Sequence, residues 1–267
     1  MLIRNKRART LARSVPGLVP VYRVLLRRYL LTRGRATLDY PGARIELRTA
    51  SDEVIGLRLR PVAKEPWTVE WIEANLQPGD VLYDIGANVG DYALIAAAVG
   101  GLRVQVVAIE PAYASYAELC ENVLLNDVAA TVLPLPVLLG ERTSLDVLAL
   151  RSTDAGAADH GAVAGQGYRQ PVLGATLDDL VQRFGAPQPT LIKLDVDGAE
   201  ASVLAGAQST LESPALRSLV IEIEASQTDA VLERMQGAGF ELTRRIDDRY
   251  GEPLPGVWYG IFDRPKH

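Results

Sequence analysis

Two carboxylates end two apolar stretches of the chain, and their positions suit the binding of a nucleoside. The first, Asp84, follows the apolar residues 81–83 and precedes a loop whose small residues include Gly86 and Gly90. An amphipathic helical pattern starts directly after this loop. A strand, a glycine-rich turn and a helix, in this order, make the first unit of a nucleotide-binding sheet. We therefore expect this segment to cradle a cofactor.

The charge of Asp84 indicates the kind of cofactor. Phosphate-binding versions of this turn use backbone N–H groups and the helix N-terminus to attract an anion, which a carboxylate two residues before Gly86 opposes. S-adenosylmethionine carries a sulfonium and an ammonium and has no phosphate, so Asp84 complements it. The alternative is that Asp84 only caps the helix that follows.

The second acid, Glu110, lies near the end of the next apolar, β-rich stretch, residues 104–111, whose last residue is Pro111. A carboxylate at the end of the second strand of such a sheet can accept both hydroxyls of a ribose. The separation from Asp84 corresponds to about one helix and two short loops, as a β-loop-α-loop-β unit requires. The pair of acids therefore predicts a nucleoside site at neighbouring strand ends.

Three stretches of the chain resemble the FkbM-type methyltransferases, a branch of the S-adenosylmethionine-dependent class I enzymes. They are DIGANVGDYALIAA from Asp84, AIEPAYASYAELCENVLLN from Ala108 and LIKLDVDGAEASVLAGA from Leu191. The resemblance covers roughly residues 66–262. It implies a Rossmann-like α/β fold, S-adenosylmethionine as the cofactor, and transfer to an oxygen, typically a hydroxyl of a sugar or a secondary metabolite. The residue types alone do not distinguish oxygen from nitrogen as the acceptor.

The resemblance also implies roles for single residues. Asp84, Gly86 and Gly90 would line the methionine end of the cofactor, with Asn88 in the same loop, and Glu110 would hold the ribose. Asn122 and Asn126 match recurring asparagines of the family, and Asn126 is included among the predicted cofactor residues. Asp195, Asp197, Gly198 and Glu200 match the motif after the fourth strand. There the chain reads Asp-Val-Asp-Gly where the family more often has Asp-Val-Glu-Gly, which shortens one carboxylate by a methylene.

Two residues are candidates for catalysis. Asp195 ends the predicted strand 190–196, where class I methyltransferases bring residues to the transferring methyl group, so we expect it to contact the acceptor or to act as a base. His160 lies in a long Gly- and Ala-rich segment, 151–170, which is either a functional lid or a disordered loop. Its ordinary pKa near neutrality would let it take a hydroxyl proton, although a solvated histidine without a role is the simpler interpretation. Lys193, within the same strand as Asp195, could pair with an acid of the site.

The order of the apolar segments predicts a mostly parallel, seven-stranded sheet with helices on both faces and a C-terminal antiparallel hairpin. The expected strands lie at 81–84, 104–111, 131–138, 190–196, 218–226, 239–246 and 256–264. The two prolines in 131–138 confine that strand to an edge or make it irregular, and either is compatible with an outer position in the sheet. We expect residues 1–65 to form a basic helical segment with a short β-hairpin at 36–60, and residues 66–267 to form the cofactor-binding domain.

Charge is unevenly distributed along the chain. Residues 1–35 hold ten basic residues and no acid, whereas the remainder holds 18 basic and 33 acidic residues. Apolar positions between 15 and 31 recur at near-helical spacing, so this segment can pack on its own acidic domain, which we favour, or lie on an anionic membrane surface. It is too short and interrupted to span a bilayer and has no secretory cleavage pattern. We expect a cytoplasmic protein, peripheral at the membrane if the second alternative holds.

Composition limits the other function classes. A pI near 5.2 argues against nucleic-acid binding. The single cysteine, Cys120, excludes an internal disulfide and a thiolate metal cluster, and the acids show no distinctive metal-ligand spacing. Two rival interpretations remain. An NAD(P)-dependent oxidoreductase should show G-x-G-x-x-G, where this loop has Asn88 in place of the second glycine. A catalytically silent cofactor-binding or membrane-associated module is harder to separate from an enzyme by sequence.

Overall fold

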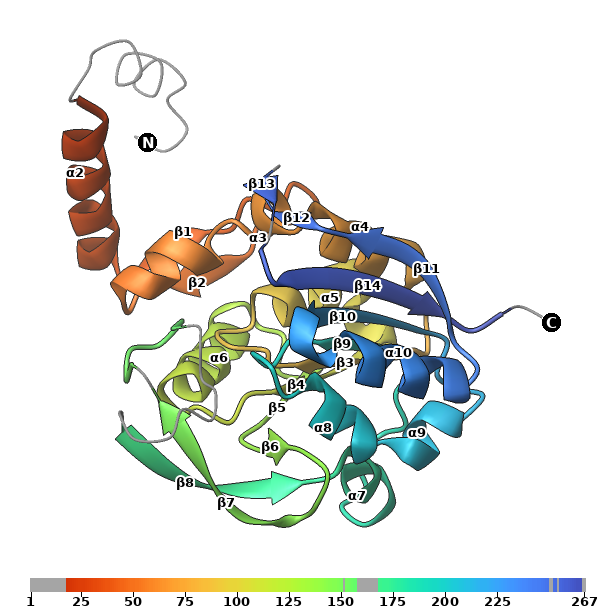
Figure 1. Ribbon diagram of the computed structural model, residues 1–267. Coiled ribbons are helices and arrows are strands. Elements are labelled where there is room, and N and C mark those ends of the chain that lie inside the picture. Colours follow the sequence, from red (N-terminus) through yellow and green to blue (C-terminus); the bar gives the residue numbers. More distant parts are fainter. Residues whose placement is uncertain (1–17, 151, 158–167, 250–251, 254, 266–267) are drawn as a thin grey trace.

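The computed structural model describes residues 18–150, 152–157, 168–249, 252–253 and 255–265 (Figure 1). Its centre is a seven-stranded sheet with the order β11-β14-β10-β9-β3-β4-β5. These strands are β3 (Val81–Ile85), β4 (Gln105–Ile109), β5 (Val132–Leu135), β9 (Leu191–Leu194), β10 (Ser218–Glu224), β11 (Glu241–Ile246) and β14 (Val257–Asp263). Each matches one of the seven predicted segments.

The pairing of the strands confirms the predicted topology. The neighbours β10, β9, β3, β4 and β5 pair in parallel, whereas β14 pairs antiparallel with both β10 and β11. The proline-containing strand β5 lies at one edge, as expected, because a proline cannot donate to a further strand. The chain runs outward from β3 to β5 and then returns to β9 on the other side of β3. Ligands of open α/β sheets bind outside the carboxyl ends of the strands at such a switch point.

Helices cover both faces of the sheet, as predicted. Side chains alternate along β3, so that Leu82 enters one apolar core and Tyr83 the other. The first core contains residues of α4 (Pro66–Asn75), α5 (Asp91–Gly100) and α6 (Tyr113–Leu125). The second contains residues of α7 (Leu177–Gln182), α8 (Glu200–Ala205), α9 (Gln208–Glu212) and α10 (Thr228–Gly237). Short helical turns, η2 (Gly101–Arg103) and η3 (Ala225–Gln227), precede β4 and α10.

The predicted N-terminal hairpin is present but shorter than expected. Only β1 (Arg35–Thr37) and β2 (Glu46–Arg48) pair, and the later part of the predicted 36–60 segment forms a π-helical turn, η1 (Val54–Arg58), before α3 (Pro61–Lys64). Leu47 of β2 is fully buried and belongs to the same apolar core as α4 and α5. Residues of the 1–65 segment therefore pack directly on the sheet-bearing part of the chain.

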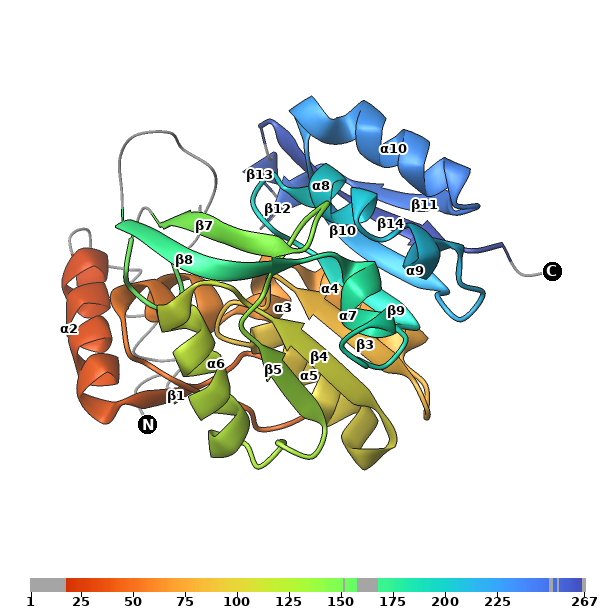
Figure 2. The same cartoon turned by 90° about the horizontal axis from the view of Figure 1, so that it is seen from below.

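A second, three-stranded sheet lies beside α6 and α7 and was not expected from the sequence (Figure 2). It contains β6 (Leu138–Leu139), β7 (Ser144–Leu150) and β8 (Tyr168–Ala175) in the order β6-β8-β7. β7 and β8 pair antiparallel over their whole length. Part of the long segment predicted as a loop at 151–170 is therefore strand, because β8 begins at Tyr168. Two further short strands, β12 (Asp248–Arg249) and β13 (Glu252–Pro253), pair with each other.

Helix α2 (Leu18–Arg33) meets the rest of the molecule near its C-terminal end and projects away from it (Figure 1). Leu30 is buried, and its carbonyl oxygen accepts a hydrogen bond from Thr49 Oγ1 at 2.7 Å. Earlier in the helix, Val24 and Leu25 are 65% and 63% exposed. Leu30 therefore packs on the rest of the protein, whereas the side chains of Val24 and Leu25 do not. Among the described residues, no helix has the length and apolar character needed to cross a membrane.

Candidate active site

A cavity of about 380 Å³ opens at the carboxyl ends of β3, β4 and β9, at the switch point of the sheet. This volume lies within the range of small-molecule sites. Its walls come from the loops after these three strands, from the β6–β7 region, and from the η1–α3 segment. The second sheet therefore supplies one wall of the candidate site.

The loop after β3 folds back on itself through backbone conformations that favour glycine. Gly86, Asn88 and Gly90 have φ values of 81°, 49° and 91°. A Cβ on Gly86 would lie 1.7 Å from the carbonyl oxygen of Asp195, so the loops after β3 and β9 meet here without room for a side chain. The predicted loop residues Gly86 and Asn88 line the cavity, whereas Gly90 packs against Leu119 of α6.

Glu110 lines the cavity and holds the loop after β3 in place. Its Oε2 accepts a hydrogen bond from the backbone N–H of Asn88 at 2.8 Å, and its Oε1 accepts one from the N–H of Ala112, also at 2.8 Å. Burial raises the pKa of Glu110 to about 7, although these two N–H donors and the charge of Arg58 favour the ionised form. Each carboxylate oxygen keeps a second acceptor site for a ligand hydroxyl.

Asp84 does not line the cavity as its side chain is placed here, so its contact with the cofactor stays a prediction. Its side chain is fully buried and is not part of the cavity lining. Lys193 is its partner across the β3–β9 pair, and Lys193 Nζ lies 3.6 Å from Asp84 Oδ1. The lysine also stands over the ring of Tyr92, 5.0 Å from its centre. Burial raises the pKa of Asp84 to about 6 despite the opposing charge of Lys193.

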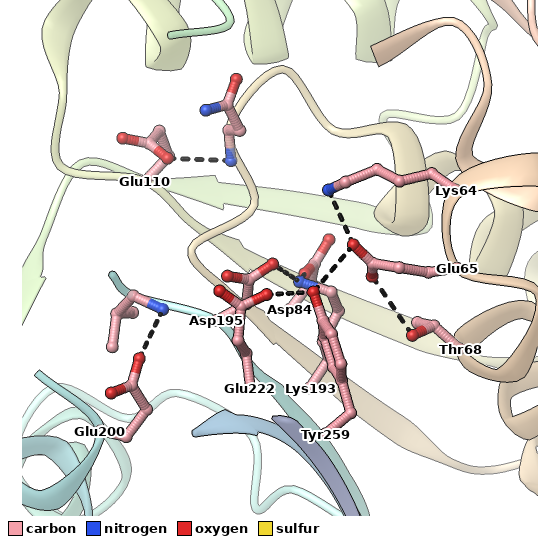
Figure 3. Close-up of polar contacts among 12 residues, drawn as sticks. Lys64, Glu65, Thr68, Asp84, Glu110, Lys193, Asp195, Glu200, Glu222 and Tyr259 are labelled. Atoms are coloured by element: carbon pink, nitrogen blue, oxygen red, sulfur yellow. Dashed lines mark hydrogen bonds and ion pairs between the residues drawn. The ribbon is translucent and has the colours of Figure 1, made fainter. Parts of the chain in front are cut away.

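Asp195 extends this chain of charges into the cavity (Figure 3). Its Oδ2 accepts a hydrogen bond from Lys193 Nζ at 3.1 Å, and its side chain lines the cavity. Burial opposes its ionisation, but the charges of Lys193 and Lys64 outweigh that effect and lower the pKa of Asp195. Asp84 is therefore connected to the cavity by Lys193, which contacts both Asp84 and Asp195.

A second group of acids meets Asp195 from distant parts of the chain. Tyr259 Oη lies 3.2 Å from Glu65 Oε1 and also hydrogen-bonds Glu222 (Figure 3). Carboxylate oxygens of Glu65, Glu222 and Asp195 all lie within 4.8 Å of one another, a spacing that could hold a metal ion. Two lysines already contact this group, since Lys64 Nζ is 2.7 Å from Glu65 and Lys193 contacts Asp195. The acids are thus partly neutralised by protein cations.

The loop after β9 is fastened by Glu200 of α8. The Oε1 of this glutamate accepts hydrogen bonds from the N–H groups of Val196 and Gly198 at 3.3 and 3.1 Å. Asp197, at the tip, has a φ of 51° and lines the cavity. Burial raises the pKa of Glu200 to about 7, against the pull of these N–H groups. Glu200 therefore shapes the loop, while Asp195 and Asp197 face the cavity.

The structure assigns Asn122 and Asn126 to the support of β2, which corrects the prediction of Asn126 as a cofactor residue. Asn126 Oδ1 accepts from the N–H of Glu46 at 2.9 Å, and its Nδ2 donates to the carbonyl of Glu46 at 2.7 Å. Asn122 Oδ1 accepts from the N–H of Arg48, and its Nδ2 donates to the carbonyl of Val89. Both amides are thus committed to backbone groups that fix the hairpin on α6. His160 lies outside the described residues.

Sequence reasoning missed several residues of the cavity. Arg58 lines it from the segment predicted to be a hairpin, Lys64 lines it from just after that segment, and Glu65 is paired with Lys64. Asp146 and the other β7 residues line it from a strand that was not recognised. The apolar run in Ser144–Leu150 was a usable signal for that strand, whereas nothing in the local pattern around Arg58 pointed to a cavity.

The fold and the cavity together define the class of protein. The sheet order, with its single antiparallel strand β14, is that of a class I methyltransferase. A solved structure of a provisionally assigned rRNA methylase from Clostridium thermocellum is similar in fold, with a TM-score of 0.50 at 10% identity, over 76% of this chain and 97% of that chain. The solved methyltransferase FkbM from Methylobacillus flagellatus KT gives a TM-score of 0.49 at 16% identity, over 92% of this chain and 60% of that chain.

The family follows from the sequence. The profile of the methyltransferase FkbM domain matches residues 84–242, more than half of the chain, and the chain belongs to this family. A curated relative, the hexuronic acid methyltransferase AglP of Haloferax volcanii, is 29% identical over 169 residues, which are 63% of this chain and 66% of the relative. The chain thus spans just under two thirds of the length of that relative. The resemblance drawn from the three sequence stretches is confirmed.

Proposed function

We propose that this methyltransferase uses S-adenosylmethionine to methylate an oxygen of a sugar or a related small molecule. The observation that carries the proposal is the pair of acids that line one cavity, Glu110 after β4 and Asp195 after β9, which lie apart from each other in Figure 3. A carboxylate that accepts ribose hydroxyls and a second, anionic carboxylate suit an adenosine with a cationic substituent. A pyrophosphate would meet the repulsion of both.

The residues at the cavity fit the cofactor in chemistry. Glu110 would accept the ribose hydroxyls, and Gly86 and Asn88, which line the cavity, would lie against the nucleoside. Among the described residues, the buried Oδ1 of Asn88 has no hydrogen-bond partner. Such an acceptor is costly to leave unpaired, and a ligand with hydroxyl donors would satisfy it.

When bound, S-adenosylmethionine supplies an electrophilic methyl group on a positively charged sulfur. The protein has to hold the acceptor oxygen in line with that methyl group, and positioning of this kind can contribute much of the rate. Asp195 would accept the hydrogen bond of the acceptor hydroxyl. A hydroxyl proton would become strongly acidic on methylation of its oxygen, so an acceptor for it has to lie within hydrogen-bond distance. A carboxylate can then take it even though Lys193 lowers the pKa of Asp195.

The relative named above supports a sugar-like acceptor, since it is named as a hexuronic acid methyltransferase. The cavity adds support because it combines the charged groups Arg58 and Asp195 with Asp146 of β7. Hydroxyl-rich acceptors are recognised by just such hydrogen-bonding groups. We therefore include hexuronic acids and neutral sugars among the acceptors to be tested.

The test has two stages. Isothermal titration with S-adenosylmethionine and with NADH separates a methyltransferase from an oxidoreductase, and we expect binding of the first alone. Transfer of a labelled methyl group to a panel of glycosides and uronosides then separates an enzyme from a silent binding module. Binding of NADH instead, or the absence of any labelled product across hydroxyl and carboxylate acceptors, would overturn the proposal.

We also propose that α2 contacts an anionic membrane surface. Val24 and Leu25 are exposed, and residues 1–35 of the chain carry ten basic residues and no acid. Exposed apolar side chains with flanking cations are the combination that binds peripheral helices to acidic lipids. A cytoplasmic protein attached in this way would meet its acceptor near the membrane.

A further inference from the structure

Arg58 is a buried cation that the site described so far does not use. It ends η1, is 8% exposed, and lines the cavity. Its Nε donates to the carbonyl oxygen of Gly156 at 3.2 Å, which is the one hydrogen bond of its guanidinium to the described residues. A guanidinium has five donors in a planar fork, and burial makes each unpaired donor costly. Because Arg58 lines the cavity, its remaining donors are placed to take a ligand there.

The nearby acids do not satisfy Arg58 by contact. Burial opposes its charge, while Asp91, Asp195 and Glu65 favour it through space and raise its pKa. None of these acids forms an ion pair with Arg58 among the described residues. Glu65 is paired with Lys64, and Asp195 is paired with Lys193. The guanidinium is thus stabilised as a cation and keeps its fork open, which is the arrangement that binds a carboxylate in bidentate fashion.

This end of the cavity carries both signs of charge. Arg58 and Lys64 line it as cations, and Asp195 and Glu222 line it as anions. Figure 3 shows Asp195, Glu222 and Glu65 grouped together, with Glu110 set apart from them. A ligand whose ribose binds at Glu110 would place its other end here. A wall of mixed charge complements a zwitterion, in which an ammonium and a carboxylate lie close together.

We propose that Arg58 is a carboxylate-binding residue, and that its ligand is the carboxylate of the amino-acid part of the cofactor. This inference rests on the proposed function and names one of its binding residues. The same chemistry could serve a carboxylate on an acidic acceptor, so the experiment carries an arm for each source.

The first arm compares two ligands on the same protein. S-adenosylhomocysteine has the amino-acid part and 5′-methylthioadenosine lacks it, so isothermal titration of both isolates the carboxylate and ammonium end. For Arg58→Met we expect the affinity for S-adenosylhomocysteine to fall by about 10- to 100-fold, with a change of less than about threefold for 5′-methylthioadenosine. Arg58→Lys keeps the charge and should fall between the two. Arg142→Met, which removes an exposed cation that also lines the cavity, is the matched control.

The second arm titrates glucuronate and glucose into the complex with S-adenosylhomocysteine. Loss of glucuronate binding alone in Arg58→Met would support the carboxylate subsite and assign it to the acceptor. An equal loss of affinity for both adenosine ligands, with no effect on glucuronate binding, would show that Arg58 acts only on the shape of the site. Unchanged affinities in both arms would show that Arg58 has no role in binding. Either result overturns the inference. Failure of the wild-type protein to bind any adenosine ligand would instead overturn the proposed function.

Discussion

Gly86 and Asp195 touch through their backbones, because a Cβ on the glycine would lie 1.7 Å from the aspartate carbonyl oxygen. The N–H of Asp195 also donates to the carbonyl of Ile85 at 3.0 Å. These contacts join the loop that begins the candidate cofactor site to the loop that carries the candidate acceptor contact. The predicted glycine is therefore required twice, by its φ of 81° and by the close approach of a second strand end.

A side chain at position 86 should be costly for this reason. We expect Gly86→Ala to lower the free energy of unfolding by about 3 kcal/mol or more, since the obstructing atom is backbone and cannot rotate away. Gly185→Ala is the matched control, because Gly185 has a φ of 74° with no atom within 4 Å of the added Cβ. That variant should lose only about 1 kcal/mol. Equal losses in urea denaturation of the two variants would contradict the role of the close contact.

Glu110 should make stability and binding depend on pH. Burial raises its pKa from 4.5 to about 7, so the folded state holds the proton more tightly than the unfolded state. The stability that this provides is fully present below about pH 4.5 and is lost as the pH rises to about 7. Glu110→Gln should remove this loss. The free energy of unfolding of the variant should therefore rise by on the order of 2 kcal/mol relative to that of wild type between pH 5 and 7.5.

The same substitution should weaken the cofactor site. A neutral amide has one carbonyl acceptor for two ribose hydroxyls, so we expect about tenfold weaker binding of S-adenosylhomocysteine to Glu110→Gln at pH 8. Wild-type affinity should rise as the pH passes 7, because the carboxylate is the better acceptor. Glu141→Gln, at an exposed acid of the cavity rim, is the control and should change neither profile. If Glu110→Gln shows the same dependence of affinity on pH as wild type, Glu110 is not the source of that dependence.

Lys193 should be the residue on which the buried acids depend. Removing it in Lys193→Met leaves Asp84 and Asp195 without the cation that contacts both, and we expect a loss of about 3 to 5 kcal/mol in unfolding free energy. Adding Asp84→Asn should recover at least about 1 kcal/mol, because one of the uncompensated charges is then gone. Strict additivity of the two substitutions in a double-mutant cycle at pH 7 would mean that they do not act as a pair.

The acids show how far sequence reasoning could go. Asp84, Glu110 and Asp195 each end an apolar run, and because the run locates the strand, the sequence pattern places all three at one edge of the sheet. The direction of the Asp84 side chain was not predictable, because it depends on Lys193, which lies more than 100 residues later and meets it only through the β3–β9 register. Glu65 and Arg58 were missed for a related reason. Both precede the sheet in sequence, and their places beside the cavity depend on how the N-terminal segment packs on the sheet, where Asn122 and Asn126 bind the backbone of β2.

Asp195 should matter more for turnover than for cofactor binding. In Asp195→Asn the carboxylate that would accept the hydroxyl proton is replaced by a neutral amide of the same size, so we expect methyl transfer to fall by about 100-fold or more. The affinity for S-adenosylhomocysteine should change by less than about fivefold, since the amide oxygen can still accept a hydrogen bond. Glu141→Gln, at an exposed acid of the cavity rim, is a control that keeps the proton acceptor in place. Equal losses of turnover and of affinity would remove Asp195 from the acceptor side of the site.

The exposed face of α2 should determine whether the protein binds vesicles. Val24→Ser with Leu25→Ser removes two apolar side chains that are 65% and 63% exposed, so folding should be unaffected while the gain from burying them in lipid is lost. We expect sedimentation of the full chain with vesicles containing phosphatidylglycerol to fall by about tenfold or more, and wild-type binding to weaken with added salt. Leu102→Ser, which changes an 84% exposed leucine on η2, should bind as wild type does. If the double variant sediments like wild type, α2 does not contact the membrane through this face. Such a result would mean that the arginines of the helix suffice for binding to acidic vesicles and that Val24 and Leu25 do not enter the lipid.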